Sequence, residues 1–279
     1  MPVQRLALIA AIIIGFMLSS AFCRAATFNW PTSPAWSNVG PASGATETVD
    51  YSFNAQGSLV VSVFNNGETF GAPSGSGIPN NGTSPAVAAN GTGPVNGGTT
   101  NNGLMLATTT TAATTSYSQV TIKFNYTGGA TNVSFTIWDV DFGGNTSWID
   151  QIHNISATTT TGSTIFATVT GSSANTVTGS GTAAAMATGT SGNTNTSANG
   201  NVTISFGATA ITSATFQWSN TATTTRTQQY IGISPVTFTP VGTAFPEVGS
   251  AAGALALCGG LACFARKRQR RPDRALAGA

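Results

Sequence analysis

The residues of this chain that could do chemistry are concentrated in one short acidic stretch. Counted from Asp139, an Asp follows at the third and twelfth positions, a Gly at the sixth and an Asn at the seventh. This spacing overlaps that of a calcium-binding loop, in which a Gly lets the chain turn and about six to eight oxygens surround the cation. The predicted calcium ligands are Asp139, Asp141, Asn145 and Asp150. The alternative is a strand connection whose carboxylates cap backbone N–H groups or face water.

Two further interpretations use the same stretch. Asp139 and Asp141 fall on one side of an extended strand, and two carboxylates can act as acid and base in polysaccharide cleavage, so a hydrolase or lyase is one alternative. Trp138 and Trp148 flank the acids and could stack on sugar rings, so a calcium-dependent carbohydrate-binding module is another. Trp138 is out of phase with the apolar face of its strand and could point outward, but the favoured interpretation places the tryptophans in the core, where they supply buried area.

The single histidine gives little support to an enzyme. A hydrolase of the serine type needs a histidine beside its nucleophile, and no motif surrounds a candidate serine near His153. We expect His153 to be a surface or half-buried strand residue. No catalytic residue is predicted.

β-strands must position these residues, because apolar and polar residues alternate along the chain with a period of two. Val120, Ile122 and Phe124 share one face, and 133–137 repeats the pattern after a turn at Gly128, so these two strands are expected to form a hairpin. About ten strands of this kind are expected between residues 46 and 238. The predicted fold is all-β, an antiparallel β-sandwich of the jelly-roll type.

Two segments interrupt the alternation. Residues 71–102 and 171–200 are dominated by Gly, Asn, Ser and Thr. They contain too few bulky side chains to offset the entropy of ordering, which predicts long surface loops. A second interpretation is that their small residues form strands that stack as a further sheet.

Residues 1–25 have the layout of a secretory signal peptide. Arg5 precedes an apolar run from Leu6 to Leu18, and small residues lead to Ala25, after which we expect cleavage. A lipoprotein signal at Cys23 is the alternative. The exported part, 26–244, contains no cysteine and must fold without disulfides.

Residues 245–279 predict a single membrane anchor. An apolar run from Val248 to Ala265 follows a Phe-Pro-Glu turn, and the predicted helix covers about 246–265. About 20 helical residues at about 1.5 Å each match the roughly 30 Å of a bilayer core. The stop-transfer residues that follow are Arg266, Lys267, Arg268, Arg270 and Arg271. Because basic residues stay on the cytoplasmic side, we expect 266–279 to lie in the cytoplasm and the residues before the helix to lie outside.

The order of turn, helix and arginine-rich end resembles the PEP-CTERM sorting signal of exported bacterial proteins. The family's core is Pro-Glu-Pro, and this chain reads Phe245, Pro246 and Glu247 with Val248 in place of the second proline. The resemblance implies an exosortase-like partner, which cleaves near this motif and transfers the protein to a surface anchor. It also implies a place at the cell envelope or surface, in an extracellular polysaccharide matrix. An ordinary single-pass anchor is the alternative.

Charge restricts the partners of the exported part. Residues 26–244 hold two basic and six acidic residues, a formal charge of minus four. Nucleic-acid binding needs clustered Lys and Arg, so that partner is excluded. We therefore predict a non-enzymatic, surface-sorted structural or adhesive protein that associates with extracellular polysaccharide, with calcium as its candidate cofactor.

Overall fold

The computed structural model describes one folded unit between the two predicted targeting segments. The described residues are 25–37, 39–52, 57–71, 84–88, 96–108, 115–144, 148–194, 196–222 and 229–242. The signal peptide before Ala25, the sorting motif, the predicted membrane helix and the basic cluster all fall outside these ranges. Within them, no helical segment has the length and apolar character that a bilayer crossing requires.

The unit is built from strands, with one short 3-10 helix, η2 (Ala198–Gly200). The strands are β1 (Ala26–Phe28), β2 (Thr46–Ser52), β3 (Ser58–Asn66), β4 (Ala86–Ala88), β5 (Gly103–Thr108), β6 (Tyr117–Phe124), β7 (Ala130–Trp138), β8 (Phe142–Gly144), β9 (Trp148–Thr159), β10 (Thr164–Phe166), β11 (Thr168–Thr170), β12 (Asn175–Thr178), β13 (Met186–Gly189), β14 (Val202–Ser205), β15 (Ile211–Asn220), β16 (Gln229–Ile233) and β17 (Val236–Pro240). The all-β prediction is confirmed.

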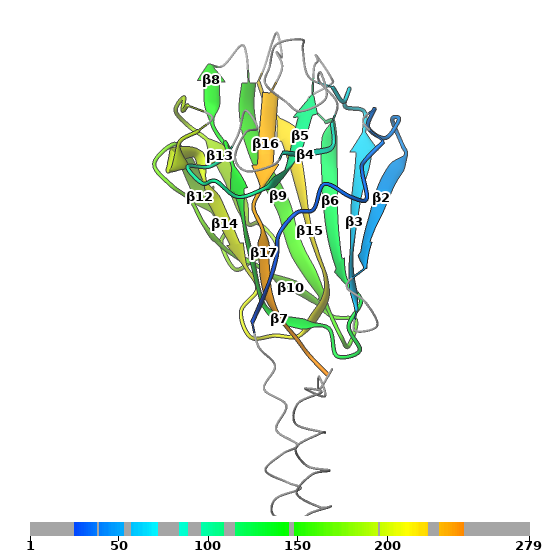
Figure 1. The fold of residues 1–279 in the computed structure, drawn as a ribbon. Coiled ribbons are helices and arrows are strands. Elements are labelled where there is room, and N and C mark those ends of the chain that lie inside the picture. Colours follow the sequence, from blue (N-terminus) through cyan, green and yellow to red (C-terminus); the bar gives the residue numbers. More distant parts are fainter. Residues whose placement is uncertain are drawn as a thin grey trace, which may run out of the picture. The chain divides into compact units, whose positions relative to one another are not determined.

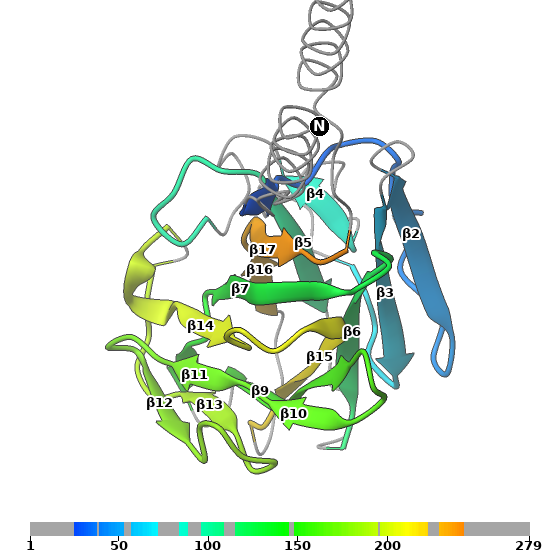
Figure 2. The same cartoon turned by 90° about the horizontal axis from the view of Figure 1, so that it is seen from below.

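The strand pairings are antiparallel and form two branches of one curled sheet. The first branch runs β2, β3, β6, β15 and β9, with β10 and the β13–β12 pair beside β9. The second runs β4, β5, β16, β7, β14 and β11, with β17 and β1 continuing the row beside β7. The branches join where Ile211 pairs with Ala130. Figures 1 and 2 show how the strands wrap round a common interior.

The interior of the curl is one hydrophobic core. Along β6, the residues Val120, Ile122 and Phe124 are buried while their neighbours are more exposed, as the alternation predicts. Side chains of both branches pack together there, for example Phe135 of β7 and Phe216 of β15, whose ring centroids are 5.9 Å apart. Burial of this apolar surface is the main source of stability for a unit without disulfides.

The predicted hairpin of the two most clearly alternating segments is wrong. β6 pairs with β3 and β15, whereas β7 pairs mainly with β14, β16 and β17. The turn at Gly128 and Gly129 therefore carries the chain from one branch to the other. Alternation locates a strand, but the choice of partner depends on packing across the core.

The prediction of a long surface loop at 171–200 is also wrong. The alternative, that the small residues of this segment form strands, is closer to the structure. β12 and β13 form a hairpin there, and Ala187 of β13 pairs with Ile152 of β9. The small residues need no core of their own, because the hairpin extends an existing sheet edge. Of 71–102, the described parts hold β4 and a turn at Gly97 and Gly98, and the remainder lies outside the described residues.

Both ends of the unit lie at one end of the sheet. Ala26 of β1 pairs with Phe238 of β17, and Pro240 pairs with Ala130 at the start of β7 (Figure 1). Asp139 directly follows the last residue of β7. The acidic stretch therefore lies at the opposite end of the sheet from the points where the chain enters and leaves.

Candidate functional site

The acidic stretch is built as a bend and a short hairpin. Asp139 has a φ of 66°, which few residues other than glycine adopt, and the N–H of Val140 donates to the Gly200 carbonyl at 2.8 Å. β8 then pairs with β9 around the segment that contains Asn145, which lies outside the described residues. The described residues on both sides of that segment are strands, as the alternation predicted.

Three carboxyl groups of this stretch are buried. Asp139, Asp141 and Asp150 are 6%, 4% and 1% exposed. Asp150 and Ile152 are buried on the same inward face of β9, so the Asp150 carboxyl borders the hydrophobic core. A buried carboxyl needs partners that replace its water, and the hydrogen bonds decide what this acidic cluster of three residues can do.

Uncharged donors serve two of the three carboxyls. Asp141 accepts from the Trp148 indole Nε1 at 2.8 Å and from the backbone N–H of Asn193 at 2.8 Å. Asp150 accepts from the Trp218 indole Nε1 at 2.9 Å, and more distantly from the Asp141 N–H at 3.4 Å. These contacts tie β9, β15, the residue before β8 and the chain before η2 together. The bond from the Asn193 N–H is of the backbone-capping kind that the alternative to a calcium loop expected, whereas the indole donors were not predicted.

The third carboxyl lacks such support. The Oδ1 atom of Asp139 is buried without a hydrogen-bond partner. Lys123 is the one Lys or Arg among the described residues, and it pairs with Ser213 of β15. Asp150 pairs with Asn220, which lies seven residues further along the same strand. Seven strand residues span roughly 23 Å, so the charge of Lys123 does not compensate the cluster.

Burial therefore raises the pKa of each acid. Desolvation, with a smaller contribution from the neighbouring Asp141, raises the pKa of Asp139 to about 7. Desolvation also raises the pKa of Asp141, against the lowering effect of the Trp148 and Asn193 donors. For Asp150, burial raises the pKa well above its ordinary value, although the bond from Trp218 lowers it. Each carboxyl of the cluster thus holds its proton to a higher pH than a free aspartic acid does.

The metal prediction gains no geometric support from the described part of the chain. There, no group of three or more His, Cys, Asp or Glu side chains is arranged to hold a metal ion. The four-residue set as a whole is not described, because Asn145 is missing from it. The calcium site remains a prediction.

Four of the five tryptophans lie in the interior, as the favoured interpretation predicted, so they do not form a sugar-binding platform. Trp30, Trp36, Trp138 and Trp218 are all buried, and Trp148 is half-buried. Trp138 does face away from the main core, but Gly97, Gly103 and Gly232 cover its ring so closely that a Cβ at Gly97 would lie 2.2 Å from it. The outward-facing interpretation of Trp138 is therefore wrong, because a second layer of chain covers that face.

His153 is a half-buried strand residue, as predicted. Its Nε2 lies 3.2 Å from the Ser219 hydroxyl, and its ring meets that of Tyr117 edge-on at 6.5 Å. Burial lowers the pKa of His153, so the neutral imidazole predominates at pH 7. The serine is 5% exposed, which leaves little access for a substrate at this pair.

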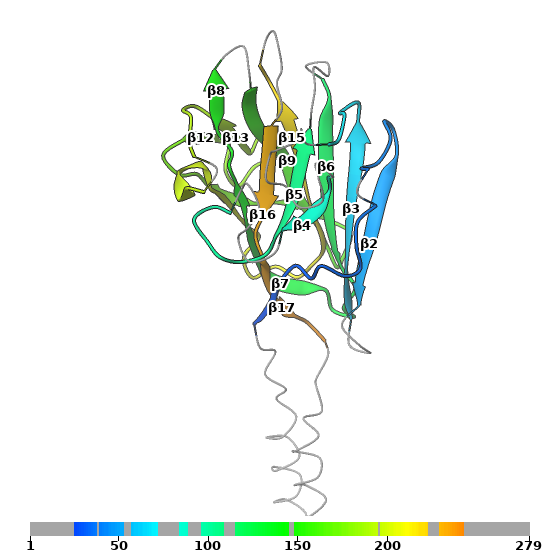
Figure 3. The same cartoon turned by 45° about the horizontal axis from the view of Figure 1, so that its top comes forward.

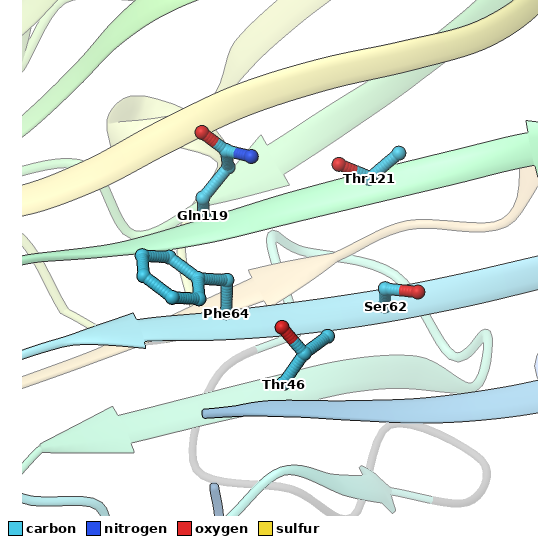
Figure 4. Close-up of a pocket in the computed structure, with 5 residues that line it drawn as sticks. All are labelled: Thr46, Ser62, Phe64, Gln119 and Thr121. Carbon is cyan, nitrogen blue, oxygen red and sulfur yellow. The ribbon is translucent and has the colours of Figure 1, made fainter. Parts of the chain in front are cut away.

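A second site, which the sequence did not reveal, lies on the outer face of the first branch. β2, β3 and β6 run side by side there (Figure 3) and line a groove of about 440 Å³. The lining residues are Thr46, Ser62, Phe64, Gln119 and Thr121 (Figure 4). They alternate with the buried residues of their strands, so the available signal was the outward half of the same period-two pattern.

The two candidate sites differ in access. The acidic cluster is closed and internally hydrogen-bonded, whereas the groove is open and carries no charged side chain. Of these two sites among the described residues, the groove is the one that offers a surface to a large ligand. Compared with known proteins, the chain matches no family model, no curated protein and no solved structure.

Proposed function

We propose that this chain is an exported, surface-sorted protein whose β-rich unit has a structural or adhesive role in an extracellular polysaccharide matrix. The observation that carries the proposal is the agreement between the limits of the sheet and the predicted targeting segments. β1 begins at Ala26, directly after the expected cleavage site, and β17 ends at Pro240, shortly before Phe245. Removal of the signal peptide would therefore leave every strand in place.

The tail would sort and hold the protein at the cell surface. An exosortase-like enzyme would recognise Phe245, Pro246 and Glu247, and the basic residues from Arg266 onward would stay in the cytoplasm. Since the chain enters and leaves the sheet at one end, the anchor would hold that end.

We also propose that the curled sheet is a jelly-roll-like sandwich. Its two branches share the single pairing of Ile211 with Ala130, and side chains of both pack face to face, as in the contact of Phe124 with Phe238 at 5.4 Å. Two antiparallel layers around one core are the usual arrangement of such sandwiches. Sandwiches of this kind serve as rigid carriers of binding surfaces.

The alternative functions have weaker support. A calcium-dependent carbohydrate site built on tryptophans lacks accessible rings, because four of the five are buried. A hydrolase or lyase built on Asp139 and Asp141 would need both carboxyls to reach a polysaccharide, and they are 6% and 4% exposed. A non-enzymatic role therefore agrees best with the geometry.

The mature protein recovered from the cell envelope tests this proposal. We expect its intact mass to correspond to a chain that begins at Ala26, whereas a lipoprotein would begin at an acylated Cys23. Proteinase K added to intact cells should remove the β-rich unit. Retention of residues 1–25, or a β-rich unit that is protected until the cells are broken, would overturn the export proposal.

A further inference from the structure

We propose that the groove on β2, β3 and β6 binds an uncharged polysaccharide chain. The inference rests on the proposed function, for which it names a ligand class and a site. The groove differs from the site that the tryptophans and acids predicted, because its residues come from three strands distant from that stretch.

An aromatic surface of the right kind lies along this face. Phe64 lines the groove, and its ring centroid is 6.3 Å from that of Tyr117, which in turn lies 6.5 Å from His153. Phe64 and Tyr117 are half-buried, so part of each side chain remains open to solvent. Sugar rings have an apolar face that packs on such side chains, and partial burial holds the aromatic ring in place.

Polar groups beside the rings match the hydroxyls of a sugar. The groove presents the hydroxyls of Thr46, Ser62 and Thr121 and the amide of Gln119, all on one side of the sheet (Figure 4). Hydroxyl and amide groups each donate and accept, as the hydroxyls of a sugar do. From β2 to β6 the groove crosses two strand spacings, about 10 Å, which accommodates a short stretch of a chain.

Cross-strand hydrogen bonds fix these side chains before any ligand arrives. Ser62 bonds to Thr48 at 2.9 Å, and Thr121 bonds to Thr215 at 3.1 Å. Gln119 accepts from the Gln217 amide at 3.0 Å. Side chains held in this way lose less entropy when they bind, so the face is preorganised for a ligand.

The charges of this face favour an uncharged chain. None of the five lining residues is ionisable. The nearest charged residues on the outer face, Asp50 and Lys123, both pair with Val60, one from each side, so their opposite charges offset one another. Binding of a polyanion requires an excess of positive charge, which this face lacks.

Isothermal titration of the full-length chain in detergent micelles tests the inference. The probes are cellohexaose, mannohexaose and xylohexaose as neutral oligosaccharides, and an alginate hexamer as the anionic one. We expect at least one neutral probe to bind. Phe64→Ala should weaken that binding tenfold or more, because the stacking surface is lost, and Thr46→Arg should do the same by filling the groove from an exposed edge position.

Two matched variants serve as controls. Phe166→Ala and Thr164→Arg make the same changes on β10, at exposed positions outside the groove, and should change the dissociation constant less than twofold. Thermal melting checks that each variant is folded. If Phe64→Ala does not fold, the binding of Thr46→Arg tests the inference in its place. The inference is overturned by binding of no neutral probe, by binding of alginate alone, or by equal effects of groove and control variants. If the protein nevertheless lies at the cell surface, the export proposal stands without the groove.

Discussion

The acidic cluster and the groove use polar side chains in opposite ways. At the cluster, three carboxyls are withdrawn from water, and two of them, Asp141 and Asp150, accept hydrogen bonds from indole and backbone N–H groups, so each of these bonds carries a large penalty if it is broken. In the groove, hydroxyls and amides bond across the strands while still open to solvent, so water replaces any bond that is lost. The carboxyl groups of the cluster therefore serve the fold, and the neutral polar groups of the groove remain open to contact with other molecules.

The largest expected effect is the dependence of stability on pH that the cluster imposes. The pKa of Asp139 rises from 3.8 to about 7 on folding, so the protonated carboxyl stabilises the fold. This contribution is complete below pH about 4 and is lost as the pH rises to about 7, on the order of 4 kcal/mol. Asp141 and Asp150 shift in the same direction. Urea denaturation at pH 5 and pH 8 should show the lower stability at pH 8, and Asp139→Asn should reduce the difference.

The same measurement tests the calcium prediction. At pH 8, where ionised carboxylates would bind a cation, added calcium should restore part of the stability if Asp139, Asp141, Asn145 and Asp150 form a site. An unchanged midpoint would contradict that site. A free energy of unfolding that increases from pH 5 to pH 8 without calcium would contradict the raised pKa values and, with them, the difference between the cluster and the groove.

Removal of the Asp150 carboxyl should have the next largest effect. Asp150→Ala leaves the buried Trp218 indole without its acceptor, and we expect a loss on the order of 3 kcal/mol in the free energy of unfolding at pH 5. Asp150→Asn keeps an acceptor and should cost less. Asp50→Ala removes an exposed carboxyl of β2 and should change stability by less than about 0.5 kcal/mol. Equal costs for Asp150→Ala and Asp50→Ala would remove the cluster's structural role.

A smaller effect is expected from the indole that bonds to Asp141. Trp148→Phe removes the N–H donor but keeps an aromatic ring, at a cost of about 1 kcal/mol. Because that donor lowers the pKa of Asp141, the pKa should rise in the variant. Titration of the carboxyl carbon by NMR would show the shift. A double-mutant cycle with Asp141→Asn isolates the bond, and a coupling energy near zero would mean that the ring contributes by packing alone.

Sequence patterns predicted the positions of individual strands better than they predicted which strands pair. The alternation at Val120 to Phe124 located β6, but the same alternation suggested a false hairpin with β7, since both strands have similar inward faces and only packing across the core separates them. The acids stood out because charged residues are rare in this chain. The groove did not stand out, because Thr46, Ser62 and Gln119 are ordinary outward residues until the sheet places them together.

The smallest change in stability is expected for a substitution in the groove, and it distinguishes the groove from the acidic cluster most directly. Thr121→Ala removes one hydroxyl from the bond between Thr121 and Thr215, whose length of 3.1 Å is close to those of the carboxyl bonds in the cluster. Because both residues are half-buried and water can take the place of the lost hydroxyl, we expect a change below about 0.5 kcal/mol in the free energy of unfolding. The same variant should weaken binding of the neutral oligosaccharide severalfold, since water in the groove must then be displaced without an equivalent partner. If Thr121→Ala instead lowers the free energy of unfolding as much as Asp150→Ala does and leaves binding unchanged, the hydrogen bonds of the outer face stabilise the sheet, as those of the cluster do, and do not serve ligand binding.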